Sequence, residues 1–151
     1  MLKGIDQRLS ADIVHALMLM GHGDDLLICD VNHPAASIAK DTIFGRLIDM
    51  AGCDSPTGLQ AILTLLPLDN FVDSPVTRMQ IVGNPDGQVP IFAAVQAVCD
   101  AAQGAPVVIQ ALERFAFYAR AKQAFCVIRT SDSGPYGCFI VKKGVIDLPP
   151  L

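Results

Sequence analysis

Apolar residues recur along this chain at two spacings, one typical of amphipathic helices and one typical of buried strands. Within residues 10–20 they lie three and four positions apart, which predicts a helix that Ser10 caps. The apolar face of that helix is formed by four residues, Ile13, Val14, Leu17 and Met18. The same spacing predicts further helices over residues 54–66, 90–102 and 113–123. Short apolar runs predict strands over residues 26–29, 76–82, 107–109, 125–128 and 139–141.

The order of these elements predicts the fold class. Strands that alternate with helices are typical of an α/β fold, expected here as a three-layer sandwich with a mostly parallel sheet flanked by helices. Only a loop separates the last two strands, so we expect them to form an antiparallel C-terminal hairpin at one edge. The chain has 151 residues and no internal repeat or interdomain linker, so residues 1–151 are expected to form one domain.

The amino-acid composition indicates which kinds of partner the protein is expected to have. Apolar residues make up 52% of the chain and charged residues only 17%, so part of the apolar surface is expected to be buried between subunits. No apolar run approaches the ~20 residues of a membrane-spanning helix, and the first residues lack the pattern of a signal peptide. The net charge of −4 and the scattered basic residues argue against nucleic-acid binding. We therefore expect a cytoplasmic homo-oligomer with no membrane or nucleic-acid partner.

The cysteines and the missing motifs exclude several classes of site. The five cysteines are widely spaced and form no CxxC pair, which disfavours a disulfide framework or a structural metal site. Three of them, Cys29, Cys99 and Cys126, lie in apolar runs and are interpreted as small core residues. The chain lacks GxSxG, Walker and GxGxxG motifs, which disfavours serine hydrolases, P-loop enzymes and Rossmann dehydrogenases.

The segment Gly21-His22-Gly23-Asp24 connects the first predicted helix to the first predicted strand. Its glycines allow a sharp turn, and an imidazole is the side chain that titrates nearest neutral pH. Asp30 follows the strand at its carboxyl end, where open α/β sheets collect ligands, so we expect His22 and Asp30 to share a site. Two plainer interpretations stay open, with His22 as a polar loop residue and Asp30 as the first residue of a turn.

Further polar residues at loops or element ends complete the candidate site. The full set is His22, Asp30, Asp69, Arg114, Tyr118 and Tyr136. Arg114 and Tyr118 lie four positions apart, on one face of a predicted helix. An imidazole, carboxylates, an arginine fork and phenols suit a polyhydroxylated ligand and proton transfer without a metal or cofactor. Arg114, Tyr118 and Tyr136 also have structural interpretations, as an ion-pair partner, a helix residue and a hairpin residue.

Seven motifs, in their order and spacing, resemble one known family along nearly the whole chain. They are Met20-Gly21-His22-Gly23-Asp24, Asp30 followed by Pro34, Leu65-Leu66-Pro67-Leu68-Asp69, Glu113-Arg114-Phe115-Ala116-Phe117-Tyr118, Ala124-Phe125, Tyr136-Gly137 and Lys142-Lys143-Gly144-Val145. The chain resembles the L-fucose mutarotase / D-ribose pyranase (FucU/RbsD) family. Glycine after the loop histidine and the Arg-Phe-Ala-Phe-Tyr run are similar to the fucose-type branch, whereas ribose-type members usually have threonine there and lack the run.

The resemblance implies an isomerase that interconverts the α and β anomers of L-fucose or a related sugar, with D-ribose pyranase activity as a further expectation. It also implies a ring-like oligomer, an octamer or decamer. In this interpretation His22 donates a proton, and Asp30, Arg114, Tyr136 and Gly137 bind the sugar. The remaining positions that match family contacts are Asp69, Tyr118 and Cys138.

The chain departs from the family pattern at three places. Cys138 stands where asparagine usually follows Tyr-Gly, His33 stands where fucose-type members tend to have an aromatic residue, and residues 43–57 are longer than usual. These departures bear on which sugar is preferred more than on the reaction. Cys138 is expected to tune that preference and not to act as a nucleophile, because mutarotation passes through a free aldehyde and needs no covalent intermediate.

The expected mechanism makes His22 the principal acid/base, held in its tautomer by Asp24 or Asp30, with Tyr136 as the second proton relay. Two rival hypotheses stay open. In one, the protein is a non-catalytic sugar-binding accessory of monosaccharide uptake, and His22 only forms hydrogen bonds. In the other, it is a different isomerase or a thiol enzyme in which Cys138 takes part.

Overall fold

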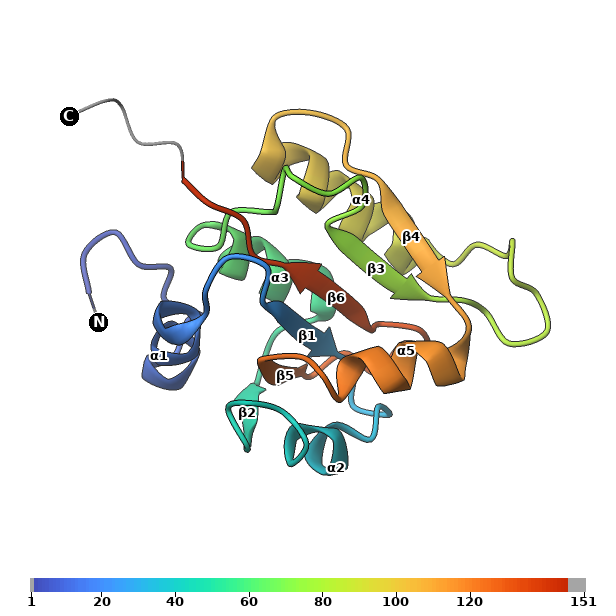
Figure 1. Cartoon of the computed structure of the whole chain (residues 1–151), viewed down its shortest axis with the longest axis horizontal. Helices are drawn as coiled ribbons and strands as arrows, with labels where there is room; N and C mark the ends of the chain where they lie inside the picture. The colour runs from blue at the N-terminus through green and yellow to red at the C-terminus, as the bar shows by residue number, and fades with distance from the viewer. Residues whose placement is uncertain (1, 147–151) are drawn as a thin grey trace.

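The computed structural model describes residues 2–146 as one six-stranded sheet between two layers of helices (Figure 1). The strands are β1 (Asp25–Cys29), β2 (Leu47–Met50), β3 (Val76–Met79), β4 (Ile109–Leu112), β5 (Cys126–Thr130) and β6 (Phe139–Lys142). The helices are α1 (Ala11–Leu19), α2 (Ala35–Ala39), α3 (Ser55–Leu63), α4 (Pro90–Gln103) and α5 (Arg114–Ala121). The strand order is β2-β5-β1-β6-β3-β4, with β6 antiparallel to both of its neighbours and the other pairs parallel. The predicted α/β sandwich with a mostly parallel sheet is confirmed.

Alternation along the strands divides the core into two layers. In β1, Leu26 and Ile28 pack in one cluster with α1, α3 and α4, whereas Leu27 and Cys29 pack in the other with α2 and α5. Successive side chains of a strand point to opposite faces, so a continuous apolar run fills both layers. The apolar run that predicts β1 is therefore the signature of an interior strand covered on both faces.

Local sequence sets the ends of the helices. Ser10 accepts a hydrogen bond from the N–H of Ile13 at 3.3 Å and caps α1, as predicted. Asp54 caps α3 through the N–H of Thr57 at 2.8 Å. Gly104 ends α4 with φ 71°, a left-handed conformation that favours glycine. None of the helices within residues 2–146 is long and apolar enough to cross a membrane.

The last strand is not where the sequence pattern places it. The predicted hairpin of β5 and β6 is wrong, because β6 lies between β1 and β3 and is antiparallel to both (Figure 1). Both sides of β5 are taken by its parallel partners β1 and β2, so residues 131–138 instead cross over β1. Phe139, Ile140 and Val141 are all fully buried, which suits a central strand and not an edge.

Two short elements are absent from the prediction. β2 lies at an edge of the sheet and exposes Asp49, so its sequence contains no apolar run. α2 has five residues, which is too short to display a helical period. Both lie within residues 35–50, between the motifs that resemble the FucU/RbsD family.

The bounds of two strands and the exposure of one side chain also differ from the prediction. β3 ends at Met79, before the predicted end at residue 82, because Ile81 and Asn84 bridge across a turn. β4 begins at Ile109, two positions into the predicted apolar run, where it pairs with Val76 of β3. Met18 is 79% exposed although it belongs to the predicted apolar face of α1.

Candidate functional site

Five of the predicted site residues line one pocket of about 290 Å³: Asp30, Arg114, Tyr118, Tyr136 and Cys138. The pocket lies at the carboxyl edge of the sheet, which we define as the edge where β1, β3 and β4 end. Because β6 is antiparallel, its first residues reach the same edge and bring Tyr136 and Cys138 to Asp30. Gly137, also predicted, lies between them and donates its N–H to Asp30. Topology therefore gathers residues that are far apart in the sequence.

Asp30 joins two loops at the floor of this pocket. Its Oδ1 accepts hydrogen bonds from the N–H groups of Asn32 at 2.9 Å and His33 at 3.0 Å. Its Oδ2 accepts from the N–H of Gly137 at 2.9 Å and from the thiol of Cys138 at 3.3 Å. Asp30 is only 3% exposed, so these donors supply the partners that a buried carboxylate needs. Asp30 thus opens a turn through its side chain and also lines the pocket, while its role toward a ligand stays a prediction.

Arg114 and Tyr118 reach the pocket from the first turns of α5, one helical turn apart as predicted. The guanidinium of Arg114 stacks over the ring of Phe115, with its Cζ 4.7 Å from the ring centroid. The Nε of Arg114 is buried and has no hydrogen-bond partner among residues 2–146. Burial raises the pKa of Tyr118, so its phenol stays protonated and can donate. The pair supplies N–H and O–H groups suited to hydroxyl oxygens.

Tyr136 has an unusual backbone. Its φ of 62° is the one positive value outside glycine in the part of the chain that the structure describes. This conformation costs roughly 1–2 kcal/mol for a side-chain-bearing residue, and Tyr136 is one of the residues that line the pocket. The Tyr136 hydroxyl accepts a hydrogen bond from the N–H of Val82 at 3.0 Å. Its own proton is therefore left to donate to a ligand.

His33 is a pocket residue that the candidate set omits. It is 6% exposed, its Nδ1 lies 3.4 Å from the Sγ of Cys138, and its Nε2 is buried without a partner within residues 2–146. Burial lowers the pKa of His33 to about 4, against the opposing charge of Asp30. The departure from the family's aromatic residue is the sequence signal that points to it.

Cys138 lacks the environment of a reactive thiol. Burial, with the charge of Asp30 added, raises the pKa of Cys138 well above its ordinary value. A nucleophilic cysteine needs the opposite, a lowered pKa and a cationic neighbour. His33, its nearest imidazole, is neutral near pH 7. These surroundings oppose the hypothesis of a thiol enzyme.

The lowered pKa of His33 predicts a pH-dependent stability. Its pKa rises from about 4 in the folded protein to the ordinary 6.5 on unfolding, so the unfolded chain binds more protons between these values. Stability is therefore expected to fall by about 2 kcal/mol as the pH drops from 7 to 5. Urea unfolding at both pH values measures it. The variant His33→Phe is the control, and an equally steep pH dependence in that variant would contradict the assignment.

His22 lies elsewhere, in a pair with Asp69. The two side chains meet with Nε2 3.1 Å from Oδ1, and the side chain of His22 is 43% exposed. Burial opposes ionisation of Asp69, but hydrogen bonds from the Phe71 N–H and from His22 outweigh it and hold the pKa of this carboxyl below its ordinary value. A carboxylate only accepts, so the His22 proton sits on Nε2 and leaves Nδ1 free to exchange a proton with a ligand. Asp69, and neither Asp24 nor Asp30, therefore orients His22.

The loop that carries His22 is fixed from three sides. The N–H of Gly23, a residue with φ 86°, donates to the carbonyl of Lys143 at 2.8 Å. The ammonium of Lys142 donates to the carbonyl of Gly23 at 2.9 Å. Asp24, expected as a partner of His22, instead accepts the N–H of Gly21 at 2.7 Å. At Gly144, a Cβ would lie 2.6 Å from the Leu68 carbonyl oxygen, so only glycine lets this strand end pass beside Asp69.

Within one chain, His22 and Asp30 do not share a site. His22 precedes β1 and Asp30 follows it, so the five residues of the strand separate them by roughly 16 Å. His22 and Asp69 lie at the amino edge of the sheet, where β1 and β3 begin. The expectation that His22 and Asp30 share a site is therefore wrong for a single subunit, because the loop before a strand and the residue after it lie at opposite edges of the sheet.

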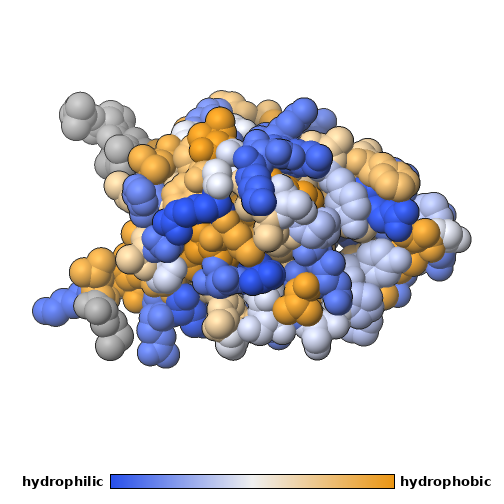
Figure 2. All heavy atoms as spheres, turned by 90° about the horizontal axis from the view of Figure 1, so that it is seen from below, coloured by the Kyte–Doolittle hydropathy of each residue, from blue (hydrophilic) through white to orange (hydrophobic). Residues whose placement is uncertain are grey.

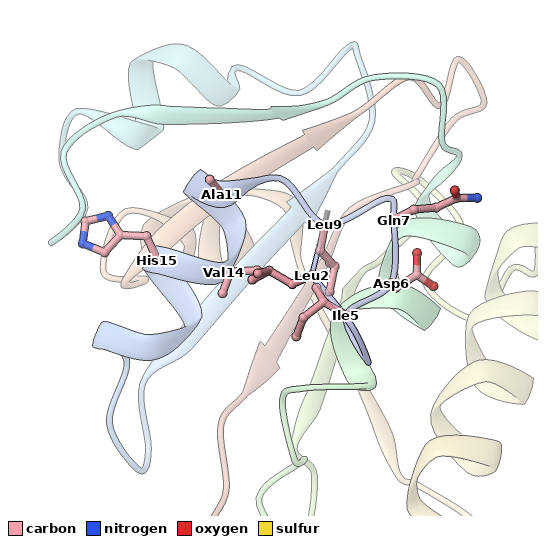
Figure 3. Close-up of a pocket in the computed structure, with 8 residues that line it drawn as sticks. All are labelled: Leu2, Ile5, Asp6, Gln7, Leu9, Ala11, Val14 and His15. Atoms are coloured by element: carbon pink, nitrogen blue, oxygen red, sulfur yellow. The ribbon is translucent and has the colours of Figure 1, made fainter.

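A larger pocket of about 720 Å³ lies under the N-terminal segment (Figure 3). Figure 3 shows Leu2, Ile5, Leu9 and Val14 turned toward one another, while the ring of His15 points away from them. The carboxylate of Asp6 is held in an ion pair by Arg8 at 2.6 Å. The interior is thus apolar and brings no pair of titratable groups together.

Comparisons with known proteins identify the family of this chain. The model of the RbsD / FucU transport protein family matches residues 3–146. The human protein named fucose mutarotase is 39% identical over 99% of this chain and 97% of its own length. The solved fucose mutarotase of Streptococcus pneumoniae, in complex with L-fucose, is 35% identical with a TM-score of 0.86, covering 97% of this chain and 100% of that chain.

Two further solved structures extend the comparison. One, described as a putative sugar binding protein, is 46% identical with a TM-score of 0.94 and covers 97% of both chains. The other, RbsD of Bacillus subtilis complexed with D-ribose, is 18% identical with a TM-score of 0.75, covers 97% of this chain and 100% of that chain, and shows the shared fold alone. On the match to the family model and to these relatives, the chain belongs to the RbsD / FucU transport protein family.

Proposed function

We propose that this protein is a monosaccharide mutarotase that interconverts the α and β anomers of L-fucose or a related sugar. The observation that carries the proposal is the pocket in which Arg114, Tyr118, Tyr136 and Asp30 converge, with donors left for a polyhydroxylated ligand. The human relative named fucose mutarotase and the Streptococcus pneumoniae structure with L-fucose support the choice of sugar.

Mutarotation needs only two coordinated proton transfers. Opening the cyclic hemiacetal requires an acid that protonates the ring oxygen and a base that removes the proton of the anomeric hydroxyl. Rotation of the resulting aldehyde and closure on its other face exchange the anomers, with the two roles reversed. Closure through a different hydroxyl would change the ring size, which is how the proposed pyranase activity would follow.

In this proposal some pocket residues hold the sugar and others transfer protons. The guanidinium of Arg114 and the phenol of Tyr118 would hold sugar hydroxyls at fixed positions. Tyr136 has a hydroxyl proton left over after accepting from Val82, so it would serve as one proton relay. The second relay needs a group that titrates near pH 7. His33, with a pKa of about 4, does not meet that need.

We assign this second relay to His22, whose imidazole has one nitrogen that can accept a proton and one that can donate it, provided that it comes from a second subunit. Its Asp69 partner fixes the tautomer, and its side chain is 43% exposed at the amino edge of its own chain. A head-to-tail contact, in which the amino edge of one subunit covers the carboxyl edge of the next, would bring His22 to the pocket. Such a contact repeats by rotation and closes into a ring, which we propose to be an octamer or decamer.

The surface around His22 favours this assembly. Met18 and Ile146 line the same hollow as His22 and are exposed, and the ring of exposed Phe71 lies 5.2 Å from the imidazole ring. Figure 2 shows several hydrophobic side chains at the left of the view, with further ones scattered among hydrophilic side chains over the rest of this face. An apolar surface of this kind around a polar pair is typical of a surface buried between subunits.

The proposal predicts measurable anomer exchange without a cofactor. NMR exchange spectroscopy on equilibrated sugars, including L-fucose and D-ribose, is expected to show exchange between anomers that rises in proportion to protein concentration. L-fucose is expected to respond most strongly. Uncatalysed rates for every sugar, with binding retained, would contradict the proposal and favour a sugar-binding accessory protein.

A further inference from the structure

Asp30 has its acceptor positions filled by donors of its own chain. Oδ1 accepts two backbone N–H groups, from Asn32 and His33, and Oδ2 accepts the N–H of Gly137 and the thiol of Cys138. A carboxylate offers about four lone-pair sites. A hydroxyl of a bound sugar can therefore donate to Asp30 only if one of these four donors gives way.

The thiol is the donor that can give way. The three N–H groups belong to the backbone of the two loops and cannot turn without moving them. The S–H of Cys138 is a weak donor, makes the longest of the four contacts at 3.3 Å, and rotates about the Cβ–Sγ bond. A second acceptor lies beside it, the Nδ1 of His33 at 3.4 Å from the same sulfur.

The surroundings of His33 determine which of its nitrogens can accept. Burial lowers the pKa of His33 to about 4, so the ring carries one proton near pH 7. The ring packs at steep angles against Phe117 and Tyr118, with interplanar angles of 85° and 75°. Nδ1 lies within reach of the thiol, whereas Nε2 has no partner within residues 2–146, so a proton on Nε2 leaves Nδ1 as the acceptor. Nδ1 then has a free lone pair directed at the thiol.

We propose that His33 and Cys138 form a positioning pair that frees Asp30 for the sugar. When a sugar hydroxyl donates to Oδ2 of Asp30, the S–H of Cys138 turns to Nδ1 of His33, and no buried group loses its partner. The proton stays on sulfur throughout, and no covalent bond forms or breaks. This inference rests on the proposed function, because it requires a polyhydroxylated ligand in the pocket.

The pair also acts on specificity. A ligand with a hydroxyl directed at Asp30 gains a charge-assisted hydrogen bond, which is stronger than the S–H contact it replaces. A deoxy analogue without that hydroxyl leaves the thiol on Asp30 and gains nothing. His33 and Cys138 are the two pocket positions that depart from the FucU/RbsD pattern, and they contact each other.

The infrared S–H stretching band of Cys138 tests the proposal directly. Cys138→Ala identifies the band by difference, since the other four cysteines are also buried. In the wild-type protein the band is expected to shift when L-fucose saturates the pocket, because the acceptor changes from a carboxylate oxygen to a ring nitrogen. In His33→Phe, which has no second acceptor, saturation is expected to shift it instead toward the position of an unbonded thiol.

A kinetic cycle gives an independent readout. His33→Phe is expected to raise KM for the sugar about fivefold, with a smaller change in kcat, because sugar binding then strands a buried S–H. In the Cys138→Ala background the same substitution is expected to leave KM unchanged, since no thiol proton is displaced. In the Cys138→Ser background, which keeps a rotatable donor, His33→Phe is expected to raise KM again.

The outcomes separate this inference from the proposed function. A band that stays fixed on saturation, or an equal rise in KM with and without Cys138, overturns the inference while anomer exchange remains. Absence of both exchange and sugar binding overturns the proposed function and the inference together. If His33→Phe does not fold, the infrared comparison of free and saturated wild-type protein decides alone.

Discussion

Replacing His22 by alanine is expected to lower the rate of anomer exchange by at least about a hundredfold, because the site loses the imidazole proposed to accept and donate the proton. The fold is expected to survive, since the side chain of His22 is half-exposed and its loop is held by backbone contacts to Lys143. Sugar affinity should also remain, because the pocket at the carboxyl edge is untouched. Exchange spectroscopy for the rate and a binding titration for the affinity measure the two effects separately.

The matched control is His15→Ala. His15 is exposed on α1, contacts only the edge of the Phe44 ring among aromatic groups, and has no place in the proposed mechanism. Its substitution is expected to leave the exchange rate unchanged. Exchange at the wild-type rate in a folded His22→Ala protein would remove His22 from the mechanism and favour a sugar-binding accessory protein.

Mixing two inactive variants is expected to restore activity. His22→Ala damages the amino edge and Arg114→Ala damages the pocket at the carboxyl edge, so each variant keeps the half that the other lacks. If His22 of one subunit completes the pocket of the next, random co-assembly produces intact sites at about a quarter of the contacts between subunits. At these contacts one subunit supplies an intact amino edge and its neighbour supplies an intact pocket. Co-expression followed by exchange spectroscopy is therefore expected to recover about a quarter of the wild-type rate.

The control mixture joins His22→Ala with Asp69→Asn. Both changes lie at the amino edge, and no subunit of this mixture carries an intact pair, so the rate should lie between those of the two variants and not exceed that of Asp69→Asn alone. Sedimentation of each mixture checks that rings still assemble. Failure of the first mixture to regain activity, with rings intact, would place the whole site within one subunit and overturn the head-to-tail arrangement.

Part of the pocket at the carboxyl edge follows from local sequence pattern. Asp30 follows a recognisable apolar strand, and Arg114 and Tyr118 share a helix face, so their positions depend on local pattern alone. Tyr136 reaches the same pocket only because β6 runs against its neighbours, and the pattern predicts a hairpin there instead. The resemblance to the family includes Tyr136 among the site residues, but it does not predict the pairing of β6 with β1 and β3 that brings Tyr136 to the pocket.

The part of the site at the amino edge could not be predicted from sequence patterns. The glycines around His22 predict a turn there, but the sequence does not predict which carboxylate pairs with His22. Asp24 is near in sequence yet bonds its own turn, whereas Asp69 is brought in by the bridge between Leu68 and Lys143. A contact between segments so distant along the chain has no periodic signature. His33 is similar, since only the three-dimensional structure reveals its contact with Cys138.

The central position of β6 has a consequence for how the protein is made. Within the sheet that residues 2–146 form, the ladder β2-β5-β1 and the pair β3-β4 meet only through β6, which follows the other five strands along the chain. Until it emerges, a nascent chain carries two partial sheets with unpaired edges, which are prone to aggregate and open to proteases. The pairing of β6 with β1 spans most of the chain and is a slow folding event. The segment around β6 also supplies Tyr136 and the lysine contacts of the His22 loop, so a chain that stops before residue 136 lacks part of the pocket and part of the support of the His22 loop, as well as the strand that joins the two halves of the sheet.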